Sequence, residues 1–542
     1  MSQKNKKTPG ETKSGLHGSG KTVSPWMKGG VFESGPLDET IDADVCVIGG
    51  GVAGLTAAYR LAGEGKSVVV LEDGEIGGGE TARSTAHLST ALGKRYTRLE
   101  ELHGEPAARL IAESHQAAIE FIAETVAAED LDCELRRVNG YLFWPQDGNL
   151  KELDAELAAC ERAGLPVEKL ESAPLSFWNS GPCLRFARQG QLDPQRYASG
   201  LARAAARRGA RIFTRSHARL IPGDPLRVRA GAGLVIAKAV VIATNAPIDD
   251  RLAISTRQAA CRTYAVAAEM PLGALEEPLL LWDTTEPYHY VRLAPPAPGA
   301  TSGLILIGGE DHKVGHAADA SERWARLEAW ARARFPMMGA ITHRWSGQVQ
   351  ESVDGLAFIG RHPTEEQEVF VITGDSGSGM THGTLGGMLV ADQILGRRND
   401  WGAVYDPARV PVTSAFEFAA ANLDAAAQYL RYYSGSGDAV SADEVPPGCG
   451  AVIHRGLAPM AVSRAEDGTL TERSAICPHL GGVVCWNQAE RTWDCPVHGS
   501  RFTPSGEVVS GPANDALGTP RDPLPQNPGL GSWLRPPTPP AP

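Results

Sequence analysis

The sequence contains no hydrophobic run long enough to cross a membrane. Even its uncharged stretch from Val45 to Tyr59 is shorter than the roughly 20 apolar residues that a spanning helix needs. The first forty residues are rich in Lys, Gly and Ser, and they contain neither an apolar signal core nor a twin arginine. We therefore expect residues 1–40 to be a disordered N-terminal tail, and the protein to be cytoplasmic without a transmembrane segment.

Cysteine is also scarce, and basic residues are outnumbered by acidic ones. Nine cysteines among 542 residues are too few for a disulfide framework. The formal net charge of −12 argues against nucleic acid or an anionic membrane as a partner. The length allows about two to four domains with sizeable cores. The composition is that of a soluble enzyme.

Two short segments near the C-terminus each pair a cysteine with a histidine. Cys477 and His479 lie in the first segment, and Cys495 and His498 lie in the second. This pattern is typical of a Rieske centre, in which two cysteines bind one iron of a [2Fe-2S] cluster and two histidines bind the other. A Cys₂His₂ zinc site uses the same ligands but usually pairs Cys with Cys and His with His along the chain. The Rieske interpretation is therefore favoured, with these four residues as cluster ligands.

A glycine-rich segment near the N-terminus follows a short apolar run. The run Val45–Ile48 reads as a buried strand, and Gly49, Gly51 and Gly54 follow it before a helical segment. In a dinucleotide-binding turn these glycines allow the tight turn, the approach of the pyrophosphate and close packing of helix on strand. Glu72 ends the next apolar run, where a carboxylate binds an adenosine ribose. A purely structural glycine turn is the weaker alternative.

These landmarks resemble the FAD-dependent D-amino-acid oxidase and glycine oxidase family from about Ala43 to Gly396, and a Rieske domain from about Val445 to Leu517. The resemblance implies FAD and a [2Fe-2S] cluster as cofactors, and oxidation of a small-molecule amine or amino acid. Fusion of such a flavoprotein to a Rieske domain is itself a bacterial family, mostly of unassigned substrate. Further family-like segments are Leu192-Asp-Pro, Ala243-Thr-Asn, Glu351 to Gly360 and Gly374 to Gly383.

The resemblance also implies the domain layout and the fold class. We expect an α/β FAD-binding Rossmann-type domain with an α+β substrate domain, followed by an all-β Rieske domain. The expected oxidoreductase spans residues 41–400, with FAD-binding parts at about 41–95, 192–250 and 346–400 and substrate parts at about 96–191 and 251–345. The remaining expected parts are a linker (401–443), the Rieske domain (444–520) and a Pro-rich tail (521–542).

Several residues are expected near the flavin on the same grounds. In the resembling dimethylglycine and sarcosine dehydrogenases, a histidine at the place of His87 bonds covalently to the flavin; we favour a non-covalent contact. The loop from Gly374 could instead be a second fingerprint for NAD(P), but no second strand ending in an acid or arginine follows it, so a flavin contact is favoured. The further expected flavin-binding residues are Arg83, Ala243, Gly374, Gly377 and Gly379.

Tyr290 and Arg292 are the expected substrate residues. Glycine oxidase relatives keep a tyrosine and an arginine in this segment, and the planar guanidinium suits a carboxylate. Arg292 could equally be a solvated surface residue. No catalytic base is expected, because hydride transfer from a neutral amine to flavin mainly requires positioning and desolvation.

The cluster loops depart from the respiratory type at three places. Respiratory Rieske proteins tie their loops with a disulfide, and here Gly482 and Val497 occupy those places. Ser500 can still donate a hydrogen bond to a cluster sulfur, but Phe502 replaces the tyrosine that supplies a second hydroxyl. Fewer donors to sulfur lower the reduction potential, so we expect a value below the respiratory range.

Three functions are compatible with the sequence. The leading one is an FAD-dependent amine or amino-acid dehydrogenase that passes electrons through its own cluster to an external acceptor. The alternatives are an electron-transfer component of an oxygenase system and a redox sensor. A reductase component should carry a second nucleotide site, which the sequence does not show.

Overall fold

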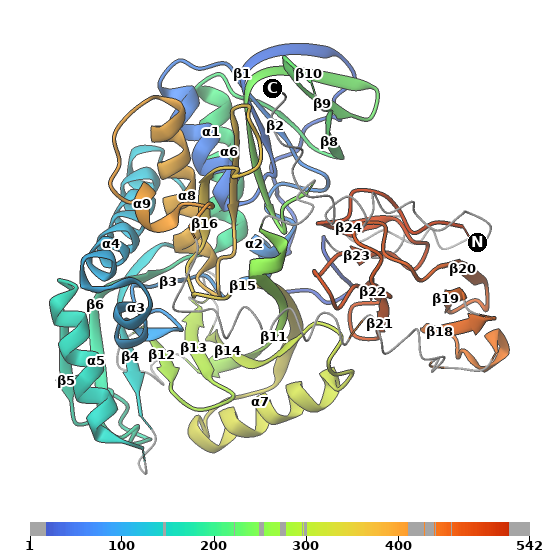
Figure 1. The fold of residues 1–542 in the computed structure, drawn as a ribbon. Helices are drawn as coiled ribbons and strands as arrows, with labels where there is room; N and C mark the ends of the chain where they lie inside the picture. The colour runs from blue at the N-terminus through green and yellow to red at the C-terminus, as the bar shows by residue number, and fades with distance from the viewer. Residues whose placement is uncertain are drawn as a thin grey trace, which may run out of the picture.

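The computed structural model describes residues 18–144, 148–221, 223–248, 254–271, 278–294, 296, 301–409, 428, 438, 441–456 and 458–519. Figure 1 shows two large sheets with their helices, and a smaller all-β unit at one side that contains the C-terminal part of the chain. The expected Pro-rich tail lies outside the described residues, as does most of the expected linker. No helix in the described part is long and apolar enough to span a membrane.

The first sheet is the Rossmann-type sheet that the glycine turn predicts. The second half of β1, Val45–Ile48, and all of β2 are apolar runs, because parallel strands covered on both faces bury their side chains there. The order is β16-β17-β10-β1-β2-β7, and β8 and β9 extend it beside β10. The strands are β1 (Thr40–Ile48), β2 (Val68–Leu71), β7 (Arg211–Phe213), β8 (Ala218–Ile221), β9 (Leu226–Ala230), β10 (Gly233–Asn245), β16 (Phe358–Arg361) and β17 (Val369–Thr373).

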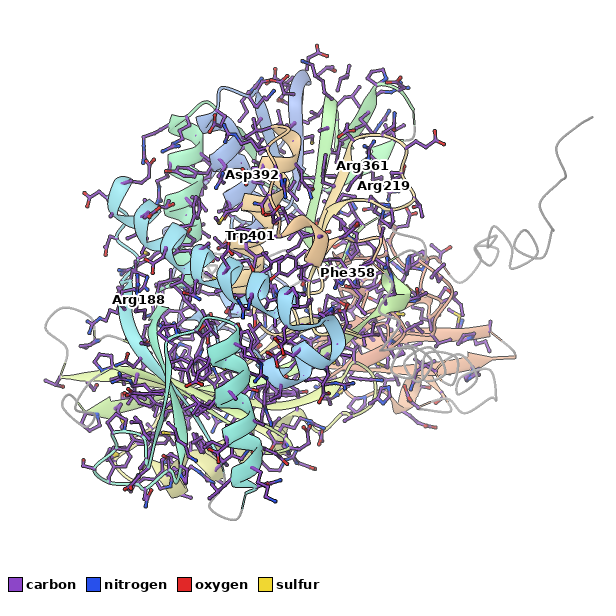
Figure 2. All side chains as sticks on the ribbon, turned by 60° about the vertical axis from the view of Figure 1, so that its left-hand side comes forward. Arg188, Arg219, Phe358, Arg361, Asp392 and Trp401 are labelled. Atoms are coloured by element: carbon purple, nitrogen blue, oxygen red, sulfur yellow. The ribbon has the colours of Figure 1, made fainter. Side chains whose placement is uncertain are left out.

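Three helices pack together beside this sheet. Helix α1 (Val52–Gly63) lies against both α6 (Pro194–Arg207) and α8 (Gly379–Ile394). Helix α6 begins where the sequence indicates, because the Asp193 side chain accepts hydrogen bonds from the backbone N–H groups of the first turn and Pro194 fits the first helical position. In Figure 2, Asp392 of α8 and Trp401 mark the side of the domain where α8 meets α9 (Gly402–Tyr405).

The second sheet forms the expected substrate domain. Its order is β15-β11-β14-β13-β12-β4-β6-β3, and β5 pairs with β6. Its helices are α3 (Arg95–His103), α4 (Glu105–Ala128), α5 (Leu150–Arg162) and α7 (Ala320–Arg334), the last packed on β11 and β14. The strands are β3 (His87–Leu88), β4 (Arg136–Phe143), β5 (Val167–Leu170), β6 (Cys183–Gln191), β11 (Gln258–Pro271), β12 (Leu279–Asp283), β13 (His289–Ala294), β14 (Ser302–Lys313) and β15 (Ile341–Ser352).

The C-terminal unit consists of two small antiparallel sheets, and the larger of its two apolar clusters lies beside the cluster segments. The core contains Val452, Trp493 and Phe502, all fully buried. The two segments with the expected cluster ligands connect β20 to β21 and β22 to β23. The strands are β18 (Cys449–Arg455), β19 (Ala458–Arg464), β20 (Leu470–Ser474), β21 (Cys485–Asn487), β22 (Thr492–Asp494), β23 (Arg501–Phe502) and β24 (Val508–Ser510).

The expectation of a disordered tail is wrong for residues 18–40. Trp26 is 6% exposed and donates from Nε1 to the carbonyl of Ser84, and Leu37 is 2% exposed. Ser24 donates to the carbonyl of Ala82 at 2.6 Å. The composition of the segment hides these anchors, because two buried apolar side chains and a few hydroxyl groups are enough to fix it along the oxidoreductase, with Trp26 on the second sheet and Leu37 on the first.

The expected linker also begins later than the sequence suggests. Residues 401–409 still pack on the oxidoreductase, and Tyr405 of α9 is fully buried. Arg409 ends this part with a hydrogen-bonded ion pair to the buried Asp354, at 2.8 Å. An arginine that neutralises a buried carboxylate is part of the domain rather than of a connecting segment.

A buried network of ion pairs fixes the C-terminal unit against the oxidoreductase. Arg83 lies 3.3 Å from Glu490, with both side chains fully buried. Arg262 pairs with Asp494 at 2.9 Å, and Arg501 lies 3.3 Å from the same carboxylate. Burial alone would raise the pKa of both acids, but the surrounding arginines outweigh it and lower the pKa of each to about 2. Both carboxylates are therefore ionised at neutral pH.

Replacing Glu490 with Gln should lower the free energy of unfolding by about 3–5 kcal/mol, because the substitution leaves the buried Arg83 without its counter-charge. Urea unfolding followed by tryptophan fluorescence measures the change. The control is Glu466→Gln, which removes an exposed pair with Arg491 and should cost at most about 1 kcal/mol.

The same pair predicts a pH dependence. The pKa of Glu490 is about 2 in the folded protein, below its ordinary value. The contribution of the Glu490 carboxylate to the free energy of unfolding is therefore complete above about pH 5, and it is lost as the pH falls toward 2. The stability difference between wild type and Glu490→Gln should shrink over that range, and a difference that stays constant down to pH 2 contradicts the assignment.

Candidate functional site

A cavity of about 750 Å³ lies between the two large sheets. The ends of β1, β2, β10 and β17 form one side, and residues of β11, β12, β13, β14 and β15 form the other. Three residues expected at the site, Gly54, Gly374 and Arg292, do not line it. The expected residues that do are Gly49, Gly51, Glu72, Arg83, His87, Ala243, Tyr290, Gly377 and Gly379.

The glycine turn has the geometry of a pyrophosphate cradle. Gly49 has φ +112°, and a Cβ there would lie 2.3 Å from the carbonyl oxygen of Ala243. A Cβ on Gly54 would lie 2.0 Å from the carbonyl oxygen of Gly49, so Gly54 serves the packing of turn and helix rather than the cavity wall. The first turn of α1 begins at the cavity, where its N–H groups and helix dipole favour a phosphate.

Glu72 is placed to bind a ribose and also holds the turn. Its carboxylate accepts hydrogen bonds from the backbone N–H of Gly50 at 2.6 Å and of Gly74 at 2.9 Å. Burial raises the pKa of Glu72 to about 7. The chain therefore supplies the turn, the helix N-terminus and the acidic residue that FAD requires in this position.

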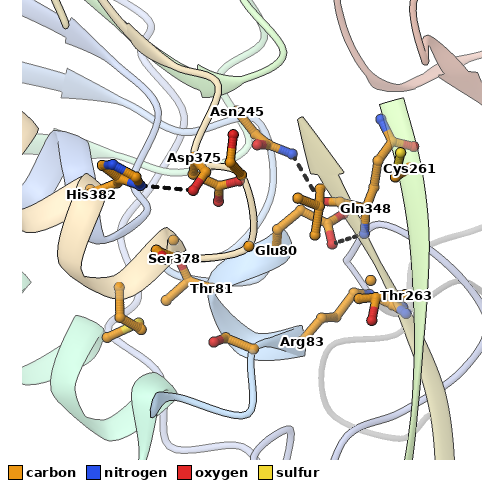
Figure 3. A pocket seen from close by; sticks show the side chains of 18 of the residues that line it. Glu80, Thr81, Arg83, Asn245, Cys261, Thr263, Gln348, Asp375, Ser378 and His382 are labelled. Carbon is orange, nitrogen blue, oxygen red and sulfur yellow. Dashed lines mark hydrogen bonds between the residues drawn. The ribbon is translucent and has the colours of Figure 1, made fainter. Parts of the chain in front are cut away.

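The loop before α8 is fixed by a pair of buried histidines. Burial lowers the pKa of His382 to about 4, so this ring is neutral at pH 7. Its Nδ1–H donates to the carbonyl of Asp375 at 2.7 Å (Figure 3). Its Nε2 accepts from Nε2 of His115 at 3.3 Å. Gly374, with φ +76°, makes the turn into this loop. The N-terminus of α8 thus lines the cavity in a defined orientation.

Arg83 reaches the cavity wall, but its guanidinium contacts the C-terminal unit. Nη1 donates to the carbonyl of Ser346 at 2.7 Å and to the hydroxyl of Thr22 at 2.9 Å, and it pairs with Glu490. These acceptors already bind the Arg83 guanidinium, which the sequence predicted to contact the flavin. Arg83 therefore links the two parts of the molecule, a role that only its non-local partners reveal.

Arg292 is not a substrate residue, and the expectation from the sequence is wrong. Its Nη1 donates to the carbonyls of Ala86 and Leu192 at 3.1 and 2.9 Å and to that of Thr85, and its guanidinium lies 4.9 Å from the centre of the Trp26 ring. The side chain is 1% exposed. Because this buried side chain does not line the cavity and its Nη1 is bonded to three carbonyls, Arg292 holds the loop that precedes His87.

His87 lines the cavity with both ring nitrogens already bonded. Burial, aided by the charge of Arg292, lowers the pKa of His87 to about 3, so the ring is neutral. Its Nε2–H donates to the carbonyl of Val291 at 3.2 Å, and its Nδ1 accepts from the hydroxyl of Thr85 at 3.0 Å. The pattern favours a non-covalent flavin contact over a covalent bond.

The wall opposite the glycine turn is aromatic and acidic. The rings of Trp282 and Tyr290 each lie 5.6 Å from the His87 ring. Tyr288 donates its hydroxyl hydrogen to Asp311 at 2.9 Å, and burial raises the pKa of Asp311 to about 7. The sequence analysis did not identify Trp282, Tyr288 or Asp311, which come together only because β12, β13 and β14 are neighbours.

The two cluster segments present their ligands in matching pairs. Cys477 and Cys495 are 1% and 2% exposed and lie close enough to hydrogen-bond, while the rings of His479 and His498 are 4.9 Å apart. No three His, Cys, Asp or Glu side chains of the described residues surround a single metal position. Two cysteines at one place and two histidines at another fit two irons better than one zinc.

The Cys477 sulfur lies within reach of the Ser500 hydroxyl, the donor that the sequence predicts. Although burial would raise it, hydrogen bonds from Cys495, from the backbone of His479 and from the Ser500 hydroxyl lower the pKa of the Cys477 thiol. A Cβ on Gly482 would lie 2.6 Å from the Val497 side chain, so these two positions do face each other without a disulfide. All nine cysteines are free.

We expect FAD to be released when the protein is denatured in acid, because both ring nitrogens of His87 are bonded within the protein. The measurement is flavin fluorescence in the supernatant and in a denaturing gel. Flavin that stays with the wild-type chain but not with His87→Ala contradicts the non-covalent assignment.

Replacing the fully buried Phe502 with Tyr should raise the reduction potential of the cluster, because the added hydroxyl can donate to a cluster sulfur. Film voltammetry on the full chain measures it, with Phe502→Leu as the control that adds no donor. A wild-type potential in the respiratory range, or an unchanged value in Phe502→Tyr, contradicts this account of the loops.

Two family models match the chain. The FAD dependent oxidoreductase family matches residues 44–393, and the Rieske [2Fe-2S] domain matches residues 437–523. The chain is 29% identical over 483 residues to YhfW of Bacillus subtilis (strain 168), named as a candidate Rieske 2Fe-2S iron-sulfur protein, covering 88% of this chain and 93% of that one. It is 28% identical over 376 residues to gamma-glutamylputrescine oxidoreductase of Escherichia coli (strain K12), covering 66% of this chain and 85% of that one.

Solved structures share the fold of the oxidoreductase part. Glycine oxidase from Geobacillus kaustophilus superposes with a TM-score of 0.58 at 21% identity, covering 68% of this chain and 99% of that one. L-Proline dehydrogenase from P. horikoshii superposes with a TM-score of 0.57 at 19% identity, covering 68% and 98%. With the cradle, the cavity and the paired ligands in place, the chain belongs to the FAD dependent oxidoreductase family and carries a C-terminal Rieske domain with a [2Fe-2S] cluster.

Proposed function

We propose that this protein oxidises an amine or amino acid at FAD and passes the electrons through its own Rieske cluster to an external one-electron acceptor. One observation supports this most directly: the loop that carries His498 lies against the wall of the FAD cavity. The carbonyl of Gly499 accepts a hydrogen bond from Gln348, a residue of that wall, at 2.9 Å. Pro496 packs against Gly315 of the substrate domain.

FAD supplies the hydride acceptor, and the chain supplies position and a dry environment. Trp282 and Tyr290 give the substrate end an apolar surface from which water is excluded, as hydride transfer requires. A neutral amine is needed for that transfer, and Asp311, with its pKa raised to about 7 by burial, can hold the released proton on its carboxylate. This carboxyl group belongs to the substrate domain and not to the FAD cradle.

Within the class, we propose that the substrate is an amine rather than an α-amino acid. The arginines that line it in the described residues are Arg83 and Arg95. Arg83 is bonded to Glu490, and the guanidinium of Arg95 lies 5.2 Å from the centre of the Trp144 ring. The Arg83 guanidinium is therefore engaged within the protein, and the other lining cations are Arg95, Lys94 and Lys313. The similarity to a relative named for gamma-glutamylputrescine points in the same direction.

The two alternatives are less well supported. An oxygenase component needs a site for a reduced nucleotide donor, and the described residues show one dinucleotide cradle, at Gly49 to Gly54. A redox sensor does not need the aromatic and acidic wall that Trp282, Tyr288 and Asp311 form opposite the glycine turn. Both alternatives remain outcomes of the experiment that follows.

Anaerobic mixing with a panel of primary amines, secondary amines and α-amino acids should bleach the flavin, with amines reacting fastest. In Cys477→Ala, which lacks a thiolate ligand and therefore the cluster, substrate should still bleach the flavin while reduction of a one-electron acceptor slows strongly. The measurements are stopped-flow absorbance and acceptor turnover. No bleaching by any member of the panel argues for the alternatives, and unchanged acceptor turnover removes the cluster from the path.

A further inference from the structure

Gln348 of β15 contacts both the FAD cavity and the cluster loop. It lines the cavity and is 2% exposed. Its backbone N–H donates to Glu80 at 2.7 Å, and its backbone carbonyl accepts from the side chain of Asn245 at 3.3 Å (Figure 3). Its side-chain amide donates from Nε2 to the carbonyl of Gly499. One buried residue therefore connects the cavity wall to the Rieske domain.

The cluster loop is seated directly on the strands at this point. Gly499 follows the ligand His498 and has φ +82°. A Cβ on Gly499 would lie 2.4 Å from the Cβ of Ala260 and 2.9 Å from Nε2 of Gln348. No side chain separates the loop from β11 and β15, so the hydrogen bond from Gln348 is a direct contact between the two redox domains.

The two buried ion pairs of the interface do not connect the cavity wall to a residue next to a cluster ligand in the same way. Arg262 binds Asp494, which precedes the ligand Cys495, but Arg262 does not line the cavity. Arg83 lines the cavity, but its partner Glu490 lies in the turn before β22, away from both ligand segments. Gln348 combines a place in the cavity wall with a bond to a residue adjacent to a ligand.

We propose that Gln348 is the positioning residue that holds the His498 loop against the FAD cavity, and that its hydrogen bond sets the rate at which electrons pass from FAD to the cluster. This inference rests on the proposed function. Each transfer takes one electron from reduced FAD and converts one Fe(III) of the cluster to Fe(II). The proton released from the flavin goes to solvent, and the external one-electron acceptor reoxidises the cluster before the next transfer.

The chain offers a matched control two residues further along the same strand. Gln350 is 1% exposed and lies near the same loop, but its side-chain amide has no hydrogen-bond partner among the described residues. Gln350→Leu therefore changes the same interface without removing a hydrogen bond to the Rieske domain. Gln348→Leu removes the donor, and Gln348→Glu removes the donor while keeping an acceptor oxygen near Arg262.

The experiment uses the full-length holoenzyme and needs no substrate. A photoreductant reduces FAD in a flash, and the absorbance of the cluster reports arrival of the electron. Hydrogen exchange of residues 495–501 reports whether the loop stays docked. We expect Gln348→Leu and Gln348→Glu to slow electron arrival several-fold and to speed exchange of the loop, with flavin content and the EPR spectrum of the cluster unchanged. Gln350→Leu should match wild type in both measurements.

Three outcomes separate the possible failures. Electron arrival at the wild-type rate in both Gln348 variants overturns the inference and leaves the proposed function intact. Equal slowing in Gln350→Leu also overturns it, because the effect then belongs to the strand and not to the hydrogen bond. A wild-type cluster that never receives an electron from reduced FAD overturns the proposed function itself.

Discussion

The rest of the structure depends on the buried ion pairs between the oxidoreductase and the Rieske domain. Arg83 and Arg262 come from the oxidoreductase, and Glu490 and Asp494 come from the Rieske domain. A charged side chain removed from water is tolerated only when its partner is in place. When the two domains are docked, all four charged side chains are paired, whereas separating the domains would require water to solvate each of them again. The relative position of the two domains is therefore part of the fold.

That constraint also explains the path of the N-terminal segment. Thr22 donates its hydroxyl hydrogen to Glu490 and accepts a hydrogen bond from Arg83, so residues 18–26 lie in the seam and complete the network. The same arrangement places the Gly499 loop on β11 and β15, whose residues line the FAD cavity. The ion pairs thus also fix the neighbouring contact between Gln348 and the Gly499 loop, because Arg262 lies beside both Asp494 and Gln348.

The fold class and the two cofactors could be predicted from the sequence because their signals depend on local spacing. The turn from Gly49 to Gly54, the acidic end of β2 at Glu72 and the cysteine–histidine pairs each lie within one short segment, where residue type and separation define the geometry. The facing of Gly482 and Val497 could be foreseen for the same reason, because both positions are set by the ligands beside them.

The features that were missed depend on partners far along the chain. Arg292 is an arginine on a strand of the substrate domain, but its guanidinium binds backbone carbonyls of a loop some two hundred residues away. A guanidinium can donate to any carbonyl or carboxylate. Its partner therefore cannot be predicted from the arginine's own segment of sequence. The signals that were present are weak ones: a tryptophan in an otherwise polar tail, and the acidic Glu490 and Asp494 close to the cluster ligands.

The central claim is that electrons move from FAD to the cluster within one chain, because the two domains are fixed together. The most direct test reduces FAD anaerobically by a flash and follows reduction of the cluster over a wide range of protein concentration. The account predicts a first-order rate that does not change with concentration. A rate that rises in proportion to protein concentration would show transfer between molecules and contradict it.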